Sequence, residues 1–237
     1  MNLQQLQREL SQLKAKGYVT SLRKGPTGIG YTLEKELNLR ENNVAIPDLG
    51  GRVELKATRR NSSSLITLFT FNRGVWQIPQ KSVVEKYGYQ DESGRLALYN
   101  LAKVGEVNTQ GLTLIIFEKN NEVKLVHESS NTVIAVWSIF TVVGKFLNKT
   151  ERLLLVLADS RLTGDNIEEF HFNEAYLLTN PKPQNFLDAF KRGSIVIDIR
   201  MHLKPNNVVR NHGTGIRIHE IDIPQLYATR RNLLHRN

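Results

Sequence analysis

The chain of 237 residues is long enough for one large domain, or for a domain with a subdomain. It contains no cysteine, which excludes disulfides, thiolate zinc sites and thiol catalysis. Its net charge of +9 favours a polyanionic partner such as a nucleic acid. It has neither the apolar run of about 20 residues that a membrane span needs nor a signal peptide's apolar core. We therefore expect a cytoplasmic protein with no membrane partner.

The chain opens with a helix and a glycine-rich loop. Leucines recur at three- and four-residue steps within residues 2–16, which predicts an amphipathic helix that ends at Gly17. The loop at 23–30 leads into a second predicted helix, Tyr31–Leu39. Its glycines could let the backbone approach a phosphate at the start of this helix, but a plain tight turn explains them equally well. The loop is not a Walker A motif, because no Gly-Lys-Ser/Thr sequence follows it.

The stretch from Asp48 to Lys56 carries the strongest chemical signal. Polar and apolar residues alternate over 52–57, which predicts a half-buried strand that points Glu54 and Lys56 to one face and the intervening apolar residues into a core. A turn before this strand can bring the carboxylate of Asp48 beside that of Glu54. Two carboxylates and an ammonium suit Mg²⁺-dependent phosphodiester hydrolysis, in which the lysine could orient or deprotonate the attacking water or stabilise the transition state. The same spacing also occurs by chance on solvated strand faces.

The remaining elements alternate between strands and helices, as in an α/β fold with a mixed sheet and a β-rich subdomain. A capping-box pattern at Ser82–Glu85 predicts a short helix. The continuous apolar run at 153–158 is typical of a strand buried in a central sheet. Further strands are predicted at 65–71, at 111–118 and 122–127 as a hairpin turned at 120–121, and at 194–200, and further helices at 137–149 and 183–191.

The C-terminal stretch 200–237 is basic and contains a second candidate site at 210–217. There Arg, Asn, His and Thr side chains are combined with two glycines. In the major groove of DNA, Arg suits guanine, Asn suits adenine, and Thr can make hydroxyl or methyl contacts. The alternative is a glycine hairpin between two strands with solvated polar residues, and the sequence alone favours this second interpretation.

Four motifs follow one another in a fixed order along the chain. They are Arg23-Lys24-Gly25-x-Thr27-Gly28-Ile29-Gly30-x-Thr32-x-Glu34, Pro47-Asp48…Glu54-Leu55-Lys56, Leu65-Ile66-Thr67-Leu68-Phe69-Thr70 and His212-Gly213-Thr214-x-x-Arg217. In this order they resemble the MvaI/BcnI family of type II restriction endonucleases, which are related to the mismatch-repair nicking enzyme MutH. The likeness spans about residues 18–230 and includes an apolar strand pattern at 196–200, so it is much more specific than the Glu-x-Lys signature alone.

The resemblance implies a PD-(D/E)xK fold, also called restriction-endonuclease-like. In this fold a central mixed β-sheet is flanked by helices and carries a β-rich DNA-recognition subdomain. The whole chain, 1–237, would form one nuclease domain. Its catalytic subdomain would comprise about 18–90 plus 150–200, and its recognition elements would lie at 65–130 and 200–237.

The resemblance also implies the site residues. Asp48, Glu54 and Lys56 match the family's catalytic residues, and Glu34 matches an auxiliary acid. The Mg²⁺ ligands would be Asp48, Glu54 and Leu55. The residues expected to contact DNA are Lys24, Thr27, Arg59, Arg60, Thr70, Arg210, Asn211, His212, Thr214 and Arg217. The gap from Asp48 to Glu54 is one residue longer than in the family, and the Gly50-Gly51 pair could absorb the extra residue as a bulge.

The expected substrate is double-stranded DNA with a short pseudo-palindromic site. Members of the family cut within CC-N-GG pentanucleotides, and BcnI-like proteins have histidines where this chain has Thr70 and Gly215. The chain is therefore nearer MvaI, and a CCWGG-like site is expected. The resemblance also implies a monomer without an obligate protein partner. One active site cuts one strand per encounter, so a duplex break would require two successive nicks.

Two other functions stay open. A MutH-like repair nickase would need an activating partner and would respond to methylation, but the MvaI-like strings argue against it. A non-catalytic DNA-binding module with a decayed nuclease site is the second alternative, and the intact Asp48, Glu54 and Lys56 argue against that one. An RNA-binding protein has no support, because the sequence offers no aromatic platform of the kind on which single strands stack.

Overall fold

The computed structural model describes residues 2–39, 44–46, 51–60, 62–71 and 74–235. The chain divides into two compact units, each built from separate stretches of sequence. Unit 1 comprises Met1–Ile66, Thr150–Lys182 and Ile223–Asn237, and unit 2 comprises Thr67–Lys149 and Pro183–Asp222. The subdomains proposed from the sequence overlap with these units: most of the catalytic segments fall in unit 1, and most of the recognition elements fall in unit 2.

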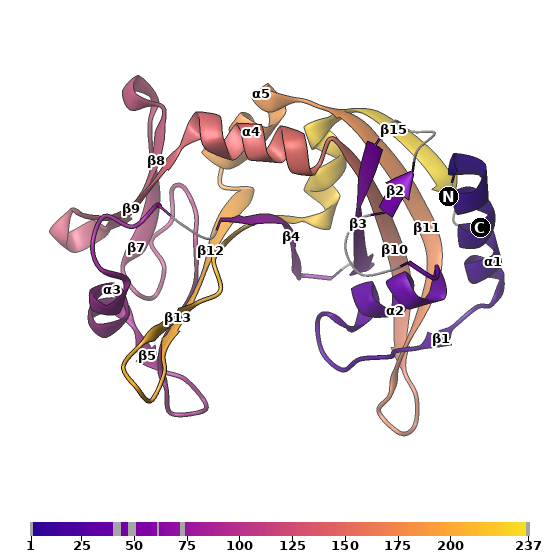
Figure 1. Cartoon of the computed structure of the whole chain (residues 1–237), viewed down its shortest axis with the longest axis horizontal. Helices are drawn as coiled ribbons and strands as arrows, with labels where there is room; N and C mark the ends of the chain where they lie inside the picture. Colours follow the sequence, from indigo (N-terminus) through magenta and orange to yellow (C-terminus); the bar gives the residue numbers. More distant parts are fainter. Residues whose placement is uncertain (1, 40–43, 47–50, 61, 72–73, 236–237) are drawn as a thin grey trace. The chain divides into compact units, whose positions relative to one another are not determined.

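Unit 1 is built on a mixed six-stranded sheet in the order β1-β11-β10-β3-β2, with β15 also paired to β11 (Figure 1). Its strands are β1 (Val19–Thr20), β2 (Val44–Ile46), β3 (Gly51–Arg59), β10 (Arg152–Leu162), β11 (Glu168–Pro181) and β15 (Tyr227–Leu234). Strands β3 and β10 run parallel, with Leu55 beside Leu154, whereas the other described pairs are antiparallel. The apolar run predicted at 153–158 lies in β10 between β3 and β11, so its prediction as a buried central strand is confirmed.

Helices α1 (Leu3–Ala15) and α2 (Gly28–Glu36) pack on one face of this sheet. Leu6, Leu10 and Leu13 are buried on one side of α1, as their helical spacing predicted, and they join a core with apolar residues of α2, β10 and β11. The Asn2 side chain caps α1 in a capping box. Helix α2 begins three residues before the predicted start, because the glycine-containing segment at 28–30 is itself helical.

Unit 2 is richer in β-structure and has two sheets. One has six strands in the order β4-β14-β12-β6-β5, with β13 also paired to β12, and the other has the order β7-β8-β9. Its strands are β4 (Leu65–Phe71), β5 (Tyr89–Gln90), β6 (Leu96–Ala102), β7 (Leu112–Phe117), β8 (Glu122–His127), β9 (Thr132–Ser138), β12 (Ile195–Leu203), β13 (Val209–Asn211) and β14 (Thr214–His219). The predicted hairpin is confirmed in β7 and β8, and Asn121 makes its turn with a φ of 53°.

The helices of unit 2 are α3 (Gln80–Tyr87), α4 (Ile139–Lys149) and α5 (Pro183–Lys191), and short 3-10 helices occur at Glu118–Asn120, Glu128–Ser130 and Glu220–Leu226. The prediction of α5 is confirmed, and so is that of α4 except for its start, because Trp137 and Ser138 end strand β9 and the helix begins at Ile139. The predicted start of α3 is wrong: the helix begins before Ser82, its N-cap is Pro79, and no side chain caps it. In α4 and α5, Phe146 stacks on Phe186, and their ring centroids are 4.4 Å apart. None of the described helices has the length and apolarity needed to cross a membrane.

Candidate functional site

Strand β3 places the Glu-x-Lys pair as its alternation predicted. Val53 is fully buried in the core of unit 1, and Leu55 packs against that core from the same face of the strand. Glu54 and Lys56 therefore share the opposite face, where the Lys56 Nζ donates to the Glu54 Oε1 over 2.6 Å. Their side chains are 25% and 21% exposed, so a ligand can reach a pair that is held in the middle of a sheet.

Of the other two predicted catalytic acids, Glu34 and Asp48, the structure describes only Glu34. Asp48 and Gly50 lie outside the described residues, so the proposed metal pair of Asp48 and Glu54 stays a prediction. Glu34 is half-buried on α2, the helix that packs against β3. No cluster of three acidic or histidine side chains suited to a metal occurs within the described ranges, and Glu54 with the backbone of Leu55 is the part of the predicted ligand set that they contain.

A buried tyrosine that the sequence did not single out lies on the same unit. The Tyr227 hydroxyl donates to the backbone carbonyl of Thr150 over 2.9 Å, just before β10 begins. Burial raises the pKa of Tyr227 well above its usual range, and the negative charge of Glu54 contributes to the increase. The phenol is therefore a neutral hydrogen-bond donor near the Glu54 carboxylate. No motif in the sequence around Tyr227 predicted this role.

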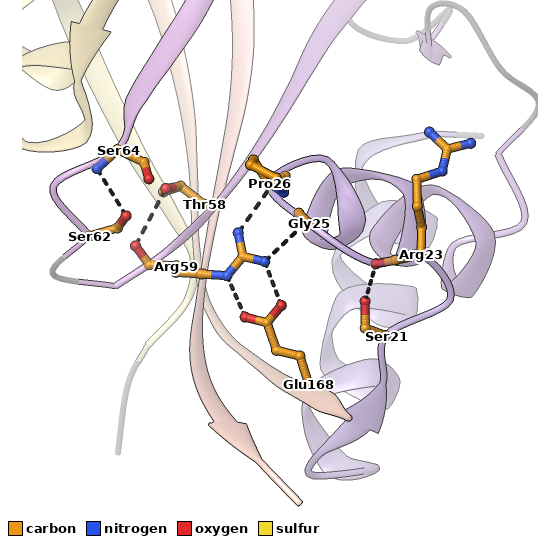
Figure 2. Close-up of polar contacts among 9 residues, drawn as sticks. All are labelled: Ser21, Arg23, Gly25, Pro26, Thr58, Arg59, Ser62, Ser64 and Glu168. Atoms are coloured by element: carbon orange, nitrogen blue, oxygen red, sulfur yellow. Dashed lines mark hydrogen bonds and ion pairs between the residues drawn. The ribbon is translucent and has the colours of Figure 1, made fainter. Parts of the chain in front are cut away.

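Two arginines predicted to contact DNA follow the Glu-x-Lys pair, and both make ion pairs within unit 1. Arg59 binds the Glu168 carboxylate (Figure 2). The Arg60 Nε lies 3.0 Å from the Asp159 Oδ1, and its Nη1 lies 2.5 Å from the Glu174 Oε2. Although burial opposes the effect, hydrogen bonds from Tyr176 and Arg60 lower the pKa of Glu174. These partners are distant from the two arginines in the sequence, so local spacing could not predict them.

The glycine loop before α2 presents its polar side chains outward. Lys24 and Thr27, both predicted to contact DNA, are exposed. Gly25 has a φ of +84°, which favours glycine, and a Cβ on Gly28 would lie 2.2 Å from the backbone oxygen of Arg23. Two of the loop's glycines are therefore required by its own backbone geometry, as in a tight turn.

The candidate recognition segment 210–217 is not the glycine hairpin that the sequence favoured. Strands β13 and β14 both pair with β12 along the same edge, so the chain continues in one direction and is interrupted only at His212-Gly213. At this break the Gly213 N–H donates to the Asn211 Oδ1 over 2.7 Å, and Gly213 has a φ of +81°. The glycine therefore interrupts one extended segment that runs beside β12, and it does not turn the chain between two paired strands.

Arg200 on β12 links two motifs that lie far apart in the sequence. Its Nη2 donates to the Thr70 Oγ1 over 3.3 Å and to the His212 carbonyl over 3.2 Å, and its Nε donates to the Gly213 carbonyl over 3.4 Å. The Lys145 Nζ also donates to the backbone carbonyl of Thr70. The predicted contact residues Thr70 and His212 thus lie in one network, centred on an arginine that appeared in the sequence only as part of an apolar strand pattern.

The remaining predicted contact residues differ in their accessibility. Arg210 and His212 are exposed. Asn211 is half-buried, and its Nδ2 donates to the Gln80 Oε1 over 3.1 Å. Thr214 is only 1% exposed, and Arg217 is held by the buried Asp198, with 2.9 Å between the Arg217 Nη1 and the Asp198 Oδ2.

A second histidine, His202, lies next to His212. The rings of His202 and His212 are 5.7 Å apart, and the Tyr99 hydroxyl contacts the His202 Nδ1 over 2.6 Å. Burial, followed by nearby arginine side chains, lowers the pKa of both histidines. The cluster of Tyr99, His202 and His212 therefore favours neutral imidazoles beside the exposed Arg210.

Comparison with known proteins agrees with this architecture. The family model described as "MvaI/BcnI restriction endonuclease family" matches residues 7–227. The structure described as "Restriction endonuclease MvaI-cognate DNA substrate complex" is 21% identical, with 98% of each chain covered and a TM-score of 0.77. "Restriction endonuclease MvaI in the absence of DNA" is 19% identical, with 98% of this chain and 97% of that chain covered and a TM-score of 0.53. No curated protein matches the chain in sequence. The predicted fold class is confirmed.

Proposed function

Because the chain belongs to the MvaI/BcnI restriction endonuclease family, we propose that it cuts double-stranded DNA at a short pseudo-palindromic site in a Mg²⁺-dependent reaction. Family membership makes it a type II site-specific deoxyribonuclease. The similar MvaI structure is described as a complex with its cognate DNA substrate. That description, with the net charge of +9, supports duplex DNA as the substrate of this chain.

The observation that carries the proposal is the Glu54–Lys56 pair. Both side chains project from the same face of β3, whose opposite face is buried, so the sheet keeps them side by side, and the Lys56 Nζ lies 2.6 Å from the Glu54 Oε1. An ammonium at this position can orient the attacking water or stabilise negative charge that develops on a phosphate oxygen. The pair therefore has the positive and negative groups that hydrolysis of a phosphodiester requires, on a rigid element.

The donor set fits a divalent metal. Restriction endonucleases generally use divalent metal ions. The Glu54 carboxylate is partly exposed, and carboxylate and carbonyl oxygens suit Mg²⁺, which binds through one or two carboxylates and keeps several waters. Glu54, the Leu55 carbonyl and Asp48 would hold the ion, with Glu34 in an auxiliary role. When bound, the metal supplies stabilisation of charge on the phosphate.

For the target sequence we propose a CCWGG-like site read by unit 2. Arg210 and His212 support this role best, since both are exposed next to the network of Arg200. Arginine is suited to guanine in the major groove. We also propose, as the resemblance to the family implies, that the chain acts as a monomer that nicks the two strands in succession.

The experiment that tests the proposal is digestion of unmethylated plasmid DNA by the purified protein with Mg²⁺, followed by sequencing of the ends. Discrete ends that share one pentanucleotide are expected. A central A·T pair would indicate a CCWGG site, and a central G·C pair would indicate a CCSGG site. Cleavage without helper proteins separates this function from a partner-activated nickase. Tight DNA binding without any cleavage would overturn the proposal and favour a non-catalytic module.

A further inference from the structure

A two-point ion pair joins the end of β3 to β11, and β10 lies between these two strands in the sheet. Arg59 ends β3 and Glu168 begins β11. The Arg59 Nε lies 2.5 Å from the Glu168 Oε1, and the Arg59 Nη2 lies 2.6 Å from the Glu168 Oε2. The two side chains are only 22% and 23% exposed. Such fork-shaped arginine–carboxylate pairs are among the strongest polar contacts and fix the orientation of both groups.

The same pair holds the glycine loop. The Arg59 Nη2 also donates to the carbonyl of Gly25 over 3.3 Å, and its Nη1 donates to the carbonyl of Pro26 over 3.4 Å (Figure 2). The backbone carbonyl of Glu168 accepts from the Ser21 N–H over 2.8 Å, where the loop begins. Arg59 and Glu168 therefore contact the loop both where it starts and at its middle, although they are 109 residues apart in the chain.

Hydrogen bonds within the loop also support its backbone. The Ser21 hydroxyl donates to the carbonyl of Arg23 over 2.7 Å, and the Gly28 N–H donates to that of Gly25 over 3.0 Å. These carbonyls are thus turned towards the protein, while the side chains of Arg23 and Lys24 are exposed. The Arg23 guanidinium lies 4.0 Å from the Tyr31 ring and points away from the Arg59 pair in Figure 2. The loop presents two cations on a braced backbone.

We propose that the Arg59–Glu168 pair is a brace that holds loop 21–28 for contact with a DNA phosphate, and that Arg59 is a positioning residue which does not itself contact DNA. Arg59 lies on the face of β3 opposite to Glu54 and Lys56, with its guanidinium 5.2 Å from the buried Phe170 ring. Binding a phosphate would require it to leave the Glu168 carboxylate. The inference rests on the proposed nuclease function and replaces, for Arg59, the direct DNA contact expected from the sequence.

Glu168→Gln distinguishes a brace from a direct contact. If Arg59 bound phosphate itself, loss of the competing carboxylate would leave DNA affinity unchanged or raise it, because a negative charge near a polyanion is removed. If the pair is a brace, the same variant weakens DNA binding, measured without Mg²⁺, by about tenfold, a size typical of residues that share a network. It also reduces the slope of log affinity against log salt by about one phosphate contact, although no cation has been removed.

Two controls are available: a double-variant test of whether Glu168 acts through Lys24 of the loop, and a variant of the neighbouring Arg161–Glu169 ion pair. Lys24→Ala should weaken binding in the wild-type chain and have a smaller effect in the Glu168→Gln background, since the contact is then already lost. Glu169→Gln, which breaks the exposed Arg161–Glu169 pair on the adjacent residue, should keep the wild-type salt slope. A general loss of stability lowers the melting temperature without changing the slope.

The outcomes separate the brace from the proposed function. If the wild-type protein cuts DNA but Glu168→Gln keeps the wild-type affinity and salt slope, the brace is wrong and the nuclease proposal stands. If the wild-type protein neither cuts nor binds duplex DNA, the nuclease proposal itself fails. Additive effects of Lys24→Ala and Glu168→Gln would also overturn the brace, because they would show that the pair does not act through the loop.

Discussion

Arg59 and Arg60 are neighbours in the chain, yet their guanidinium groups lie on opposite faces of one sheet. Arg59 ends β3 and points towards Glu168 on the side of the glycine loop. Arg60 follows the strand, still donates its N–H to the Ala158 carbonyl of β10, and points to the other side, where Asp159 and Glu174 bind it. Two cations that look equivalent in the sequence therefore cannot approach one ligand together from a single face of this sheet. Each one is instead the centre of a separate network.

The Arg60 network gives a prediction about stability. Arg60→Met should lower the free energy of unfolding by about 2–4 kcal/mol, because Asp159 and Glu174 lose their shared partner while remaining largely buried. Urea unfolding followed by circular dichroism measures the change. Arg161→Met provides the control: Arg161 is 57% exposed in its pair with Glu169 and its guanidinium lies 3.9 Å from the Tyr18 ring, so its loss should cost about 1 kcal/mol or less.

The same two variants test whether Arg60 contacts DNA. A direct contact predicts that Arg60→Met weakens DNA binding while stability stays close to wild type. A structural network predicts the opposite: a less stable protein whose folded fraction binds DNA with the wild-type salt slope. A stability change equal to that of Arg161→Met would contradict the structural role.

Lys56 is predicted to act in cleavage and not in binding. Lys56→Ala should lower the cleavage rate by about 10²- to 10⁴-fold, the usual contribution of a positioned proton-transfer group, while affinity for the cognate duplex changes little. Single-turnover cleavage and a gel-shift titration measure the two effects. Lys81→Ala is the matched control, since Lys81 is an exposed helical lysine paired with Glu85 in unit 2. Wild-type cleavage by Lys56→Ala would remove Lys56 from the mechanism.

Elements that depend on local periodicity could be predicted from the sequence. The leucines of α1, the buried run in β10 and the shared face of Glu54 and Lys56 each follow from side-chain spacing within one element. Spacing is a local property, and tertiary structure confirmed it here because the apolar face in each case had a core to pack against. For this reason the buried strand β10 and the orientation of Glu54 and Lys56 on β3 could be predicted.

Features that depend on partners distant in the sequence could not be predicted. Nothing near Arg59 indicates Glu168, and nothing in residues 210–217 indicates that β13 and β14 extend along one edge of β12. The start of α3 was misplaced because Ser82 fits a capping box in sequence, whereas the chain already turns into a helix after Pro79. Asp48 lies outside the described residues and stays a prediction.

The buried His202, beside His212, predicts a loss of stability in mild acid. The pKa of His202 is lowered by burial first, then by Arg95, His212 and Arg210, against an opposing effect of Asp91. The unfolded chain therefore takes up a proton near pH 6.5 that the folded chain resists. The corresponding stability is present above about pH 6.5 and is lost as the pH falls.

Unfolding by urea at a series of pH values between about 5 and 7.5 measures this effect. His202→Gln should show a shallower decline in stability towards acid than the wild type, even if it is less stable throughout because the Tyr99 contact is altered. His219→Gln, which changes an exposed histidine of β14, serves as the control and should keep the wild-type decline. An unchanged decline in His202→Gln would show that the buried imidazole is not its source.

Two glycines of α2 make opposite predictions for the same substitution. A Cβ on Gly28 would lie 2.2 Å from the Arg23 carbonyl oxygen and 2.8 Å from the Ser21 Oγ, whereas a Cβ on Gly30 would have nothing within 4 Å. Gly28→Ala should therefore lower the free energy of unfolding by about 1–3 kcal/mol through overpacking against backbone. Gly30→Ala should raise it by about 0.5–1 kcal/mol, since alanine loses less entropy in a helix.

Thermal and urea unfolding of the two variants side by side measure both signs. Because the atom that Gly28→Ala displaces belongs to loop 21–28, this variant should also weaken DNA binding and flatten its salt dependence, as loss of the Arg59–Glu168 brace would. Gly30→Ala should bind as the wild type does. If Gly28→Ala and Gly30→Ala had the same free energy of unfolding, the close packing of the loop against α2 would be refuted, and with it the expected effect of Gly28→Ala on DNA binding.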